Sequence, residues 1–237
     1  AWDGKRTCYV IDKTDRVQAL DVETGAFLRL WHLPDIRIGR PQRLHCAPDG
    51  GLYVADTHYG RVLHYDAQGN LLGIIGSEGT APGQMYWPTG ICLLGADLFV
   101  SEYGGHDRVQ RFAAPDGQAR FLQAFGSHGT EPGRFMRPQA LAAGPDGNLY
   151  VADTANHRIQ AFRPDGAFLR AFGEAGQGRG KLDYPFDLGF DRKGRLVVVE
   201  NATHRLSFWT PEGTWLGDLG SRGTRPGELA DPWGMAI

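Results

Sequence analysis

The 237-residue sequence contains few cysteines and no long apolar run. Its three cysteines, Cys8, Cys46 and Cys92, are odd in number and fall in segments expected to be strands. This favours buried free thiols over a disulfide framework, and it leaves the cellular compartment open. No segment approaches the roughly 18–20 consecutive apolar residues of a membrane-spanning helix.

The sequence also lacks an excess of charge of either sign. It has 25 Lys and Arg residues, of which only four are lysines, against 27 Asp and Glu residues. A near-neutral chain with so few lysines is not typical of proteins that bind polyanions generally. The motifs Gly-x-Ser-x-Gly, His-Glu-x-x-His and the phosphate-binding glycine loop are absent, so the sequence does not indicate any of these common catalytic or nucleotide-binding sites.

Glycine and proline are abundant, and the prolines mark an internal repeat. Five of them open similar units at Pro41, Pro88, Pro138, Pro185 and Pro232, with spacings of 47, 50, 47 and 47 residues. Each complete unit holds four short runs of alternating apolar residues, separated by turn sequences such as PDG and DAQG. Four antiparallel strands in a repeat of this length are typical of one blade of a β-propeller.

The two ends of the sequence each hold part of a unit. Pro232–Ile237 resembles a first strand, and Thr7–Trp31 reads as the three strands that would follow it. We therefore expect an all-β propeller of about five four-stranded blades, in which the C-terminal strand completes the N-terminal blade and leaves no unpaired edge. The expected domain is a single one, residues 1–237. The alternative is that the chain forms part of a six-bladed ring.

The units YVADTANHRIQAF and YVADTHYGRVLHY, with the turn PDGNLYVADT, resemble NHL repeats, and the resemblance covers essentially the whole chain. It implies a β-propeller, usually of six blades, and it says little about function. NHL-type peptidyl-hydroxyglycine lyases hold zinc through histidines that directly follow certain opening prolines. Those positions here are Gln42, Thr89, Gln139, Phe186 and Trp233, so that zinc site does not carry over. RNA-binding NHL domains present a broadly basic face, which this composition does not provide.

Features present in every blade are interpreted as structural. An acid ends the second strand of each unit, and an arginine follows four to six residues later. We expect five copies of one turn and ion pair rather than a metal-binding ring of carboxylates. The residues are Asp12, Asp56, Glu102, Asp153 and Glu200, with Arg16, Arg61, Arg108, Arg158 and Arg205.

Features found in one blade are better candidates for function. Small residues prevail at the third and fifth positions of the first strands, which share one face of the strand. Arg43, His45 and Asp187 are the large polar exceptions. Because an unpaired buried charge is costly, these residues either form a satisfied polar plug in the channel or face a ligand there.

The junction from Trp31 to Cys46 departs from the repeat. Four junctions carry a glycine-rich turn such as GSEGTAPG, whereas this one is shorter and contains Arg37 and Arg40 just before Arg43. An arginine cluster on a near-neutral protein suits a carboxylate or a phosphate. Solvated arginines in a shortened loop are the alternative. His58 and Tyr103 are expected on the surrounding rim, where aromatic residues stack on a ligand or pack on neighbouring junctions.

Together these patterns predict a non-catalytic scaffold that binds a peptide, a protein or a small anionic ligand on its loop-rich face. The ligand-binding residues expected from the sequence are Arg37, Arg40, Arg43, His45, His58, Tyr103 and Asp187. No catalytic residue, cofactor or metal is assigned. A metal-dependent lyase or lactone hydrolase with an axial site is the competing enzyme interpretation, and an RNA-binding NHL domain is the third.

Overall fold

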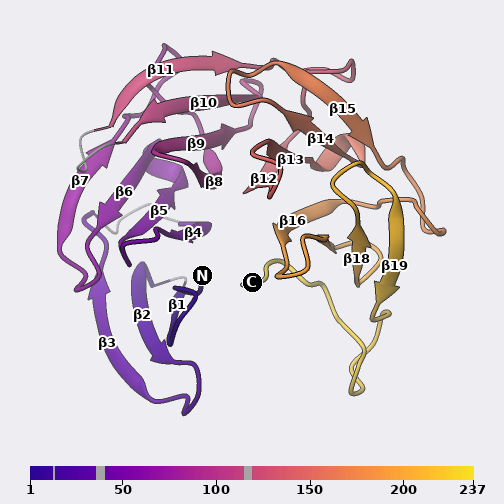
Figure 1. Cartoon of the computed structure of the whole chain (residues 1–237). Coiled ribbons are helices and arrows are strands. Elements are labelled where there is room, and N and C mark those ends of the chain that lie inside the picture. The colour runs from indigo at the N-terminus through magenta and orange to yellow at the C-terminus, as the bar shows by residue number, and fades with distance from the viewer. Residues whose placement is uncertain (13, 36–40, 115–118) are drawn as a thin grey trace.

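The computed structural model describes residues 1–12, 14–35, 41–114 and 119–237, and its regular structure is almost entirely β. In Figure 1 five antiparallel sheets stand around a common axis, with one strand of each sheet near the axis and another at the outer edge. This arrangement confirms the prediction of a β-propeller with five blades. Within each sheet the strands follow one another in chain order.

The bounds of the strands repeat from blade to blade. Blade 1 contains β1 (Thr7–Ile11), β2 (Arg16–Asp21) and β3 (Phe27–His32). Blade 2 contains β4 (Arg43–Cys46), β5 (Leu52–Asp56), β6 (Arg61–Tyr65) and β7 (Leu71–Ile75). Blade 3 contains β8 (Pro88–Leu94), β9 (Asp97–Glu102), β10 (Arg108–Ala113) and β11 (Arg120–Phe125). Blade 4 contains β12 (Pro138–Ala143), β13 (Leu149–Asp153), β14 (Arg158–Phe162) and β15 (Phe168–Phe172). Blade 5 contains β16 (Pro185–Phe190), β17 (Leu196–Glu200), β18 (Arg205–Trp209) and β19 (Trp215–Leu219).

Helix is confined, within the described ranges, to two single 3-10 turns, η1 (Thr57–Tyr59) and η3 (Thr154–Asn156). Neither turn, nor any other described helix, has the length and apolar character needed to cross a membrane.

The core lies between neighbouring blades rather than within any one of them. Tyr53 and Val62 of blade 2, for example, belong to the same buried cluster as Ile91 and Val100 of blade 3. Because each second strand is covered on both faces, its residues are apolar almost throughout; β5 and β13 are buried at all five positions.

Small residues near the axis have a steric reason. A Cβ atom added to Gly90, at the third position of its strand, would lie 2.5 Å from Ser101 Oγ and 3.1 Å from Ala140 Cα. Inner strands of adjacent blades therefore approach too closely for most side chains at this position.

The predicted closure of blade 1 by the C-terminal strand is wrong for this structure. Ala1–Asp3 takes the place beside β1: Tyr9 N donates to Ala1 O, and Asp3 N donates to Thr7 O. The Asp3 carboxylate fixes the turn by accepting hydrogen bonds from Lys5 N and Thr7 N. A local hairpin closes a short loop, and this costs less conformational entropy than pairing β1 with a segment more than 200 residues away.

Residues 232–237 lie against blade 5 instead, without strand structure. Asn201 Nδ2 donates to Pro232 O, and the rings of Phe186 and Trp233 meet edge to face at 4.6 Å. The segment thus occupies the position that the first strand of a further blade would have. In Figure 1 the blades form an arc, and the outer strands β3 and β19 do not lie side by side.

Neighbouring blades are joined by a hydrogen bond to the proline that opens the next unit. Thr57 Oγ1 donates to Pro88 O, Ser101 Oγ to Pro138 O, and Thr154 Oγ1 to Pro185 O. The Asn201 bond to Pro232 O is the fourth copy. We call this bond the proline latch.

The topology separates two faces of the propeller. Hairpins between second and third strands lie on the same face as the junctions between blades, which we call the loop-rich face; the remaining turns lie on the opposite, turn-side face. Four junctions fold alike, each with a parallel bridge such as Glu78 to Met85 or His128 to Phe135. In the departing junction, residues 36–40 lie outside the described residues, while Arg61 holds its first part by donating to Pro34 O.

Candidate functional site

The repeated acid and arginine form an ion pair in every blade. The separations between nitrogen and oxygen run from 2.5 Å for Arg16 and Asp12 to 3.0 Å for Arg205 and Glu200. In blades 2 to 5 the acid is buried, and the arginine continues to carbonyl groups of the adjoining junction; Arg158, for example, donates to Glu131 O and Arg134 O. The pair therefore ties each hairpin to the junction beside it.

The surroundings of these acids differ between blades. Burial raises the pKa of Asp153, although Asn156 and Arg158 both donate to its carboxylate and oppose that shift. Asp12 is more exposed, and hydrogen bonds from Thr14 and Arg16 lower its pKa to about 2.

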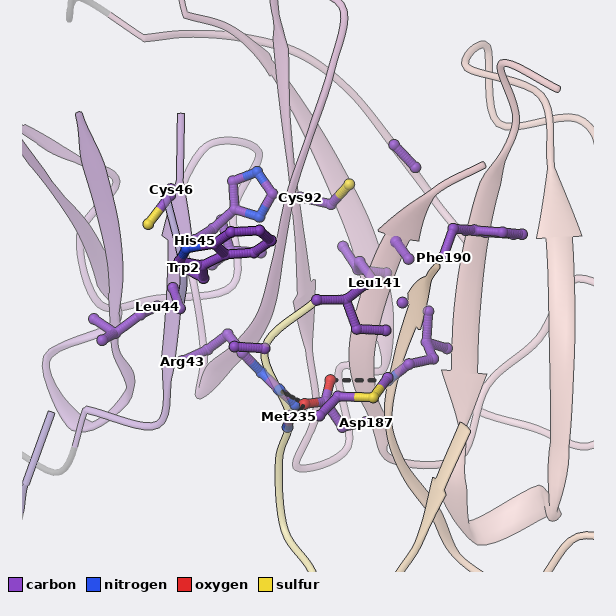
Figure 2. A pocket seen from close by; sticks show the side chains of 18 residues that line it. Trp2, Arg43, Leu44, His45, Cys46, Cys92, Leu141, Asp187, Phe190 and Met235 are labelled. Atoms are coloured by element: carbon purple, nitrogen blue, oxygen red, sulfur yellow. Dashed lines mark hydrogen bonds and ion pairs between the residues drawn. The ribbon is translucent and has the colours of Figure 1, made fainter. Parts of the chain in front are cut away.

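Near the axis, two of the residues singled out from the sequence meet. Arg43 Nη1 of β4 lies 2.6 Å from Asp187 Oδ2 of β16, and Arg43 Nη2 donates to Phe186 O. Asp187 also accepts hydrogen bonds from Met235 N and from Leu188 N. Figure 2 shows Arg43 and Asp187 pointing toward one another, with Met235 beside the carboxylate. The two charges are therefore mutually satisfied.

His45 lies two residues after Arg43 on the same strand, β4. Its Nε2 accepts a hydrogen bond from Leu93 N of the next blade. Burial, with a smaller contribution from the positive N-terminal amine, lowers the pKa of His45 to about 4. The imidazole is therefore neutral at neutral pH, and its bond to Leu93 requires the neutral form.

Two cavities lie on the axis, and Arg43 lines both. The turn-side cavity has a volume of about 270 Å³ and includes Trp2, His45, Cys92, Asp187 and Phe190 in its lining (Figure 2). The loop-side cavity has a volume of about 290 Å³. Its lining consists of Pro41, Gln42, Arg43, Thr89, Gln139, Phe186, Trp233 and Gly234.

The cysteines are free thiols, and two of them line the turn-side cavity. Burial raises the pKa of Cys46 to about 11 and that of Cys92 to about 12. Both are therefore protonated at neutral pH and have little nucleophilic character.

The loop-side cavity combines an aromatic pair with an amide that has no partner. Gln139 is only 2% exposed, and its Nε2 has no hydrogen-bond partner among the described residues. Phe186 is nearly buried, whereas Trp233, in contact with it, is 61% exposed. A buried amide without a partner is unusual in a folded protein, because it loses its hydrogen bonds to water without replacing them.

The rim residues predicted from the sequence lie apart from both cavities. His58 belongs to η1, and Tyr103 follows β9, where its ring contacts Trp87 at 5.3 Å and the Arg137 guanidinium at 5.5 Å. Trp87 also stacks on Tyr86 at 5.2 Å. The aromatic residues of this rim thus pack on one another and on the neighbouring junction.

The structure therefore brings Arg43, His45 and Asp187 together and leaves His58 and Tyr103 at the rim. Arg37 and Arg40 lie outside the described residues. Sequence reasoning did not predict that Gln139, Phe186 and Trp233 line one cavity, because it considered these positions only as zinc ligands. Their shared position after each opening proline is the signal that could have grouped them.

Within the described ranges, no group of three or more His, Cys, Asp or Glu side chains is arranged to hold a metal ion. Two histidines on the loop-rich face contact neighbouring acids and backbone amides instead. His157 Nδ1 accepts from Tyr184 N, and His204 Nδ1 accepts from Asp231 N.

Comparisons with solved structures agree on the fold. Catalytically inactive virginiamycin B lyase from Staphylococcus aureus with quinupristin is 18% identical, with a TM-score of 0.66 over 93% of this chain and 67% of that one. A streptogramin B lyase is 16% identical, with a TM-score of 0.66 over 90% of this chain and 64% of that one. A chain of a nidogen/laminin complex is 21% identical, with a TM-score of 0.68 over 97% of this chain and 80% of that one.

At these identities the likeness shows the fold alone. The chain spans about two thirds of the length of the two lyases. No curated protein sequence gives a significant match. The NHL repeat model matches residues 135–162, which run from the end of a junction through the third strand of blade 4. The chain is therefore a five-bladed β-propeller that contains an NHL repeat in blade 4.

Proposed function

We propose that this propeller is a non-catalytic binding module that receives a peptide or a loop of a partner protein on its loop-rich face, at the mouth of the axis. The observation that carries the proposal is the loop-side cavity, where an exposed tryptophan, Trp233, stands beside polar side chains that follow the opening prolines. Tryptophan and tyrosine are the residues that contribute most to protein recognition when a partner buries them.

Other exposed aromatic residues on this face support the proposal. Trp87 and Tyr184 each precede an opening proline, at 38% and 41% exposure, and both adopt a positive φ. Arg137 and Asp231 adopt the same backbone at the equivalent position, so the positive φ is a property of the junction, and the exposed area of the two rings is what supports the proposal. The nidogen/laminin complex shows a chain of the same fold within an assembly of two proteins.

The test is selection of peptides from a random display library, followed by fluorescence anisotropy with the selected peptides. We expect Trp233→Ser to weaken binding by about tenfold or more, the effect of losing one central aromatic contact. Leu72→Ser is the matched control, because Leu72 is a similarly exposed apolar residue on the outer strand β7. Peptides that respond to Leu72→Ser and not to Trp233→Ser would place recognition elsewhere.

Metal analysis separates this proposal from the lyase interpretation. Protein purified without chelators should carry no tightly held metal. One equivalent of zinc or calcium that survives gel filtration would contradict the non-catalytic proposal and favour an axial metal enzyme.

A further inference from the structure

The loop-side cavity contains a polar group that the folded chain leaves unsatisfied. The Gln139 side chain is almost completely buried, it lines the cavity, and its Nε2 has no partner among the described residues. Gln42 occupies the equivalent position two blades earlier, but it is exposed. Among the described residues that line this cavity, Gln139 is the one with a buried polar atom that has no partner.

The charges around the cavity argue for an uncharged ligand. Arg43 is the charged residue of the described lining, and its guanidinium is already neutralised by Asp187 at 2.6 Å. An anion entering the cavity would lose its hydration without meeting a free cation in that lining. An uncharged carbonyl oxygen loses less, and it is the natural acceptor for an amide N–H.

The aromatic pair sets the second requirement. Trp233 contacts Phe186 edge to face and leaves most of its indole exposed at the mouth. An apolar side chain placed on it would bury both surfaces. At about 290 Å³ the cavity is slightly smaller than typical ligand pockets, roughly 300–1,000 Å³, which suits one side chain and its peptide group.

We propose that the loop-side cavity binds an uncharged peptide unit, whose carbonyl oxygen accepts a hydrogen bond from Gln139 Nε2 while the adjoining apolar side chain packs on Trp233 and Phe186. This inference rests on the proposed function and specifies the part of the partner that enters the axis. Gln139 then acts as a recognition residue, and the cost of leaving its amide unpaired in the free protein is recovered on binding.

The first test uses the opposite effects expected on stability and on binding. Gln139→Leu replaces the unsatisfied amide with an apolar group of similar size, so Tm should rise by about 2–4 °C, the shift typical of relieving one such group in a chain of this length. Gln139→Met provides a second replacement in case leucine packs poorly. Gln68→Leu is the matched control, because Gln68 is an exposed turn residue that lines neither cavity, and it should leave Tm unchanged. A fall in Tm for both Gln139 variants would mean that the amide stabilises the free protein, which would overturn the inference.

The second test is a titration of ¹⁵N-labelled protein with N-acetyl-leucinamide, a neutral peptide unit. We expect saturable shifts of the Gln139 side-chain amide and the Trp233 indole signals, with a Kd of about a millimolar for so small a probe. N-acetyl-leucine, which carries a carboxylate, should bind about tenfold more weakly because its charge finds no free partner. The Gln139→Leu variant should lose the shift of the Trp233 signal, and Gln68→Leu, outside both cavities, should keep it.

Failure of this inference can be told apart from failure of the proposed function. If selected peptides bind in a Trp233-dependent manner but the Gln139 amide signal does not move, the binding module stands and the uncharged-peptide assignment falls. Tighter binding of N-acetyl-leucine than of the amide would likewise replace it with an anion site. If no peptide binds the wild-type protein, the proposed function itself is wrong.

Discussion

Arg43 of β4 and Asp187 of β16 join blade 2 to blade 5 across the propeller axis, with 2.6 Å between Arg43 Nη1 and Asp187 Oδ2. The pair separates the two axial cavities, because Arg43 lines both of them. It also holds the C-terminal segment, since the same carboxylate oxygen accepts from Met235 N. One ion pair thus links two distant blades and a chain segment that has no blade of its own.

Arg43→Ala and Asp187→Ala should be strongly non-additive. Each single change leaves the partner charge largely buried and unpaired, at a cost of about 3 kcal/mol in the free energy of unfolding. The double variant should lose little more than either single one, which gives a coupling of roughly 1–3 kcal/mol in a double-mutant cycle by urea unfolding. Additive losses would show that the two residues do not interact in solution.

The repeated ion pairs should differ in their effect on stability according to burial. Asp153→Ala removes the acceptor of hydrogen bonds from Arg158, Gln160 and Met136 N, and should lower the free energy of unfolding by about 3–5 kcal/mol. Asp12→Ala, at the more exposed copy in blade 1, should cost much less. Urea denaturation of both variants measures the difference, and equal losses would contradict the role assigned to burial.

Stability should decrease as the pH falls from about 6.5 toward 4, with His45 as one cause. Its pKa in the folded protein is about 4, against 6.5 for an exposed histidine, so over this range the unfolded chain binds a proton that the folded chain does not. The contribution is roughly 1.4 kcal/mol per pH unit, or about 3 kcal/mol in all. His45→Gln keeps an acceptor for Leu93 N and cannot titrate, so its stability should depend less on pH. Parallel pH profiles for the variant and the wild type would argue against this assignment.

The edge of β1 should depend on Asp3 and not on the C-terminal segment. Tyr9 N donates to Ala1 O in the hairpin that the Asp3 carboxylate supports. Asp3→Ala should therefore reduce the hydrogen-exchange protection of the Tyr9 amide by roughly tenfold, the effect of about 1.4 kcal/mol. Deletion of residues 232–237 should leave that protection unchanged. A loss of Tyr9 protection on deletion would instead support closure by the C-terminal strand.

Much of the fold follows from the sequence because the repeat specifies it several times over. The opening prolines, the PDG turns and the acid that ends each second strand recur at nearly constant spacing, so the blades and their number are predictable. Closure was not, because the repeat pattern does not show that the turn at Asp3 places residues 1–3 beside β1.

The candidate site was predictable only where charge departs from the repeat. Arg43 and Asp187 stand out because small residues occupy the equivalent position in the other first strands. The sequence does not show how close the two side chains lie in space. Gln139 does not stand out, since a glutamine after proline is unremarkable until its burial is known. The roles expected for Arg37 and Arg40 stay predictions, because both lie outside the described residues.

The proline latch has a consequence for how such arrays change in length. Each copy runs from a hydroxyl or amide of one blade to the carbonyl of the proline that opens the next, so a blade recognises only its immediate neighbour. In such a nearest-neighbour chain, a unit can be duplicated or removed without redesigning the contacts of distant units. The number of blades then depends on the curvature that the contacts between neighbours produce together. The ion pair of Arg43 and Asp187 joins blades that are not neighbours, so it is one of the few contacts that a change in blade number would alter.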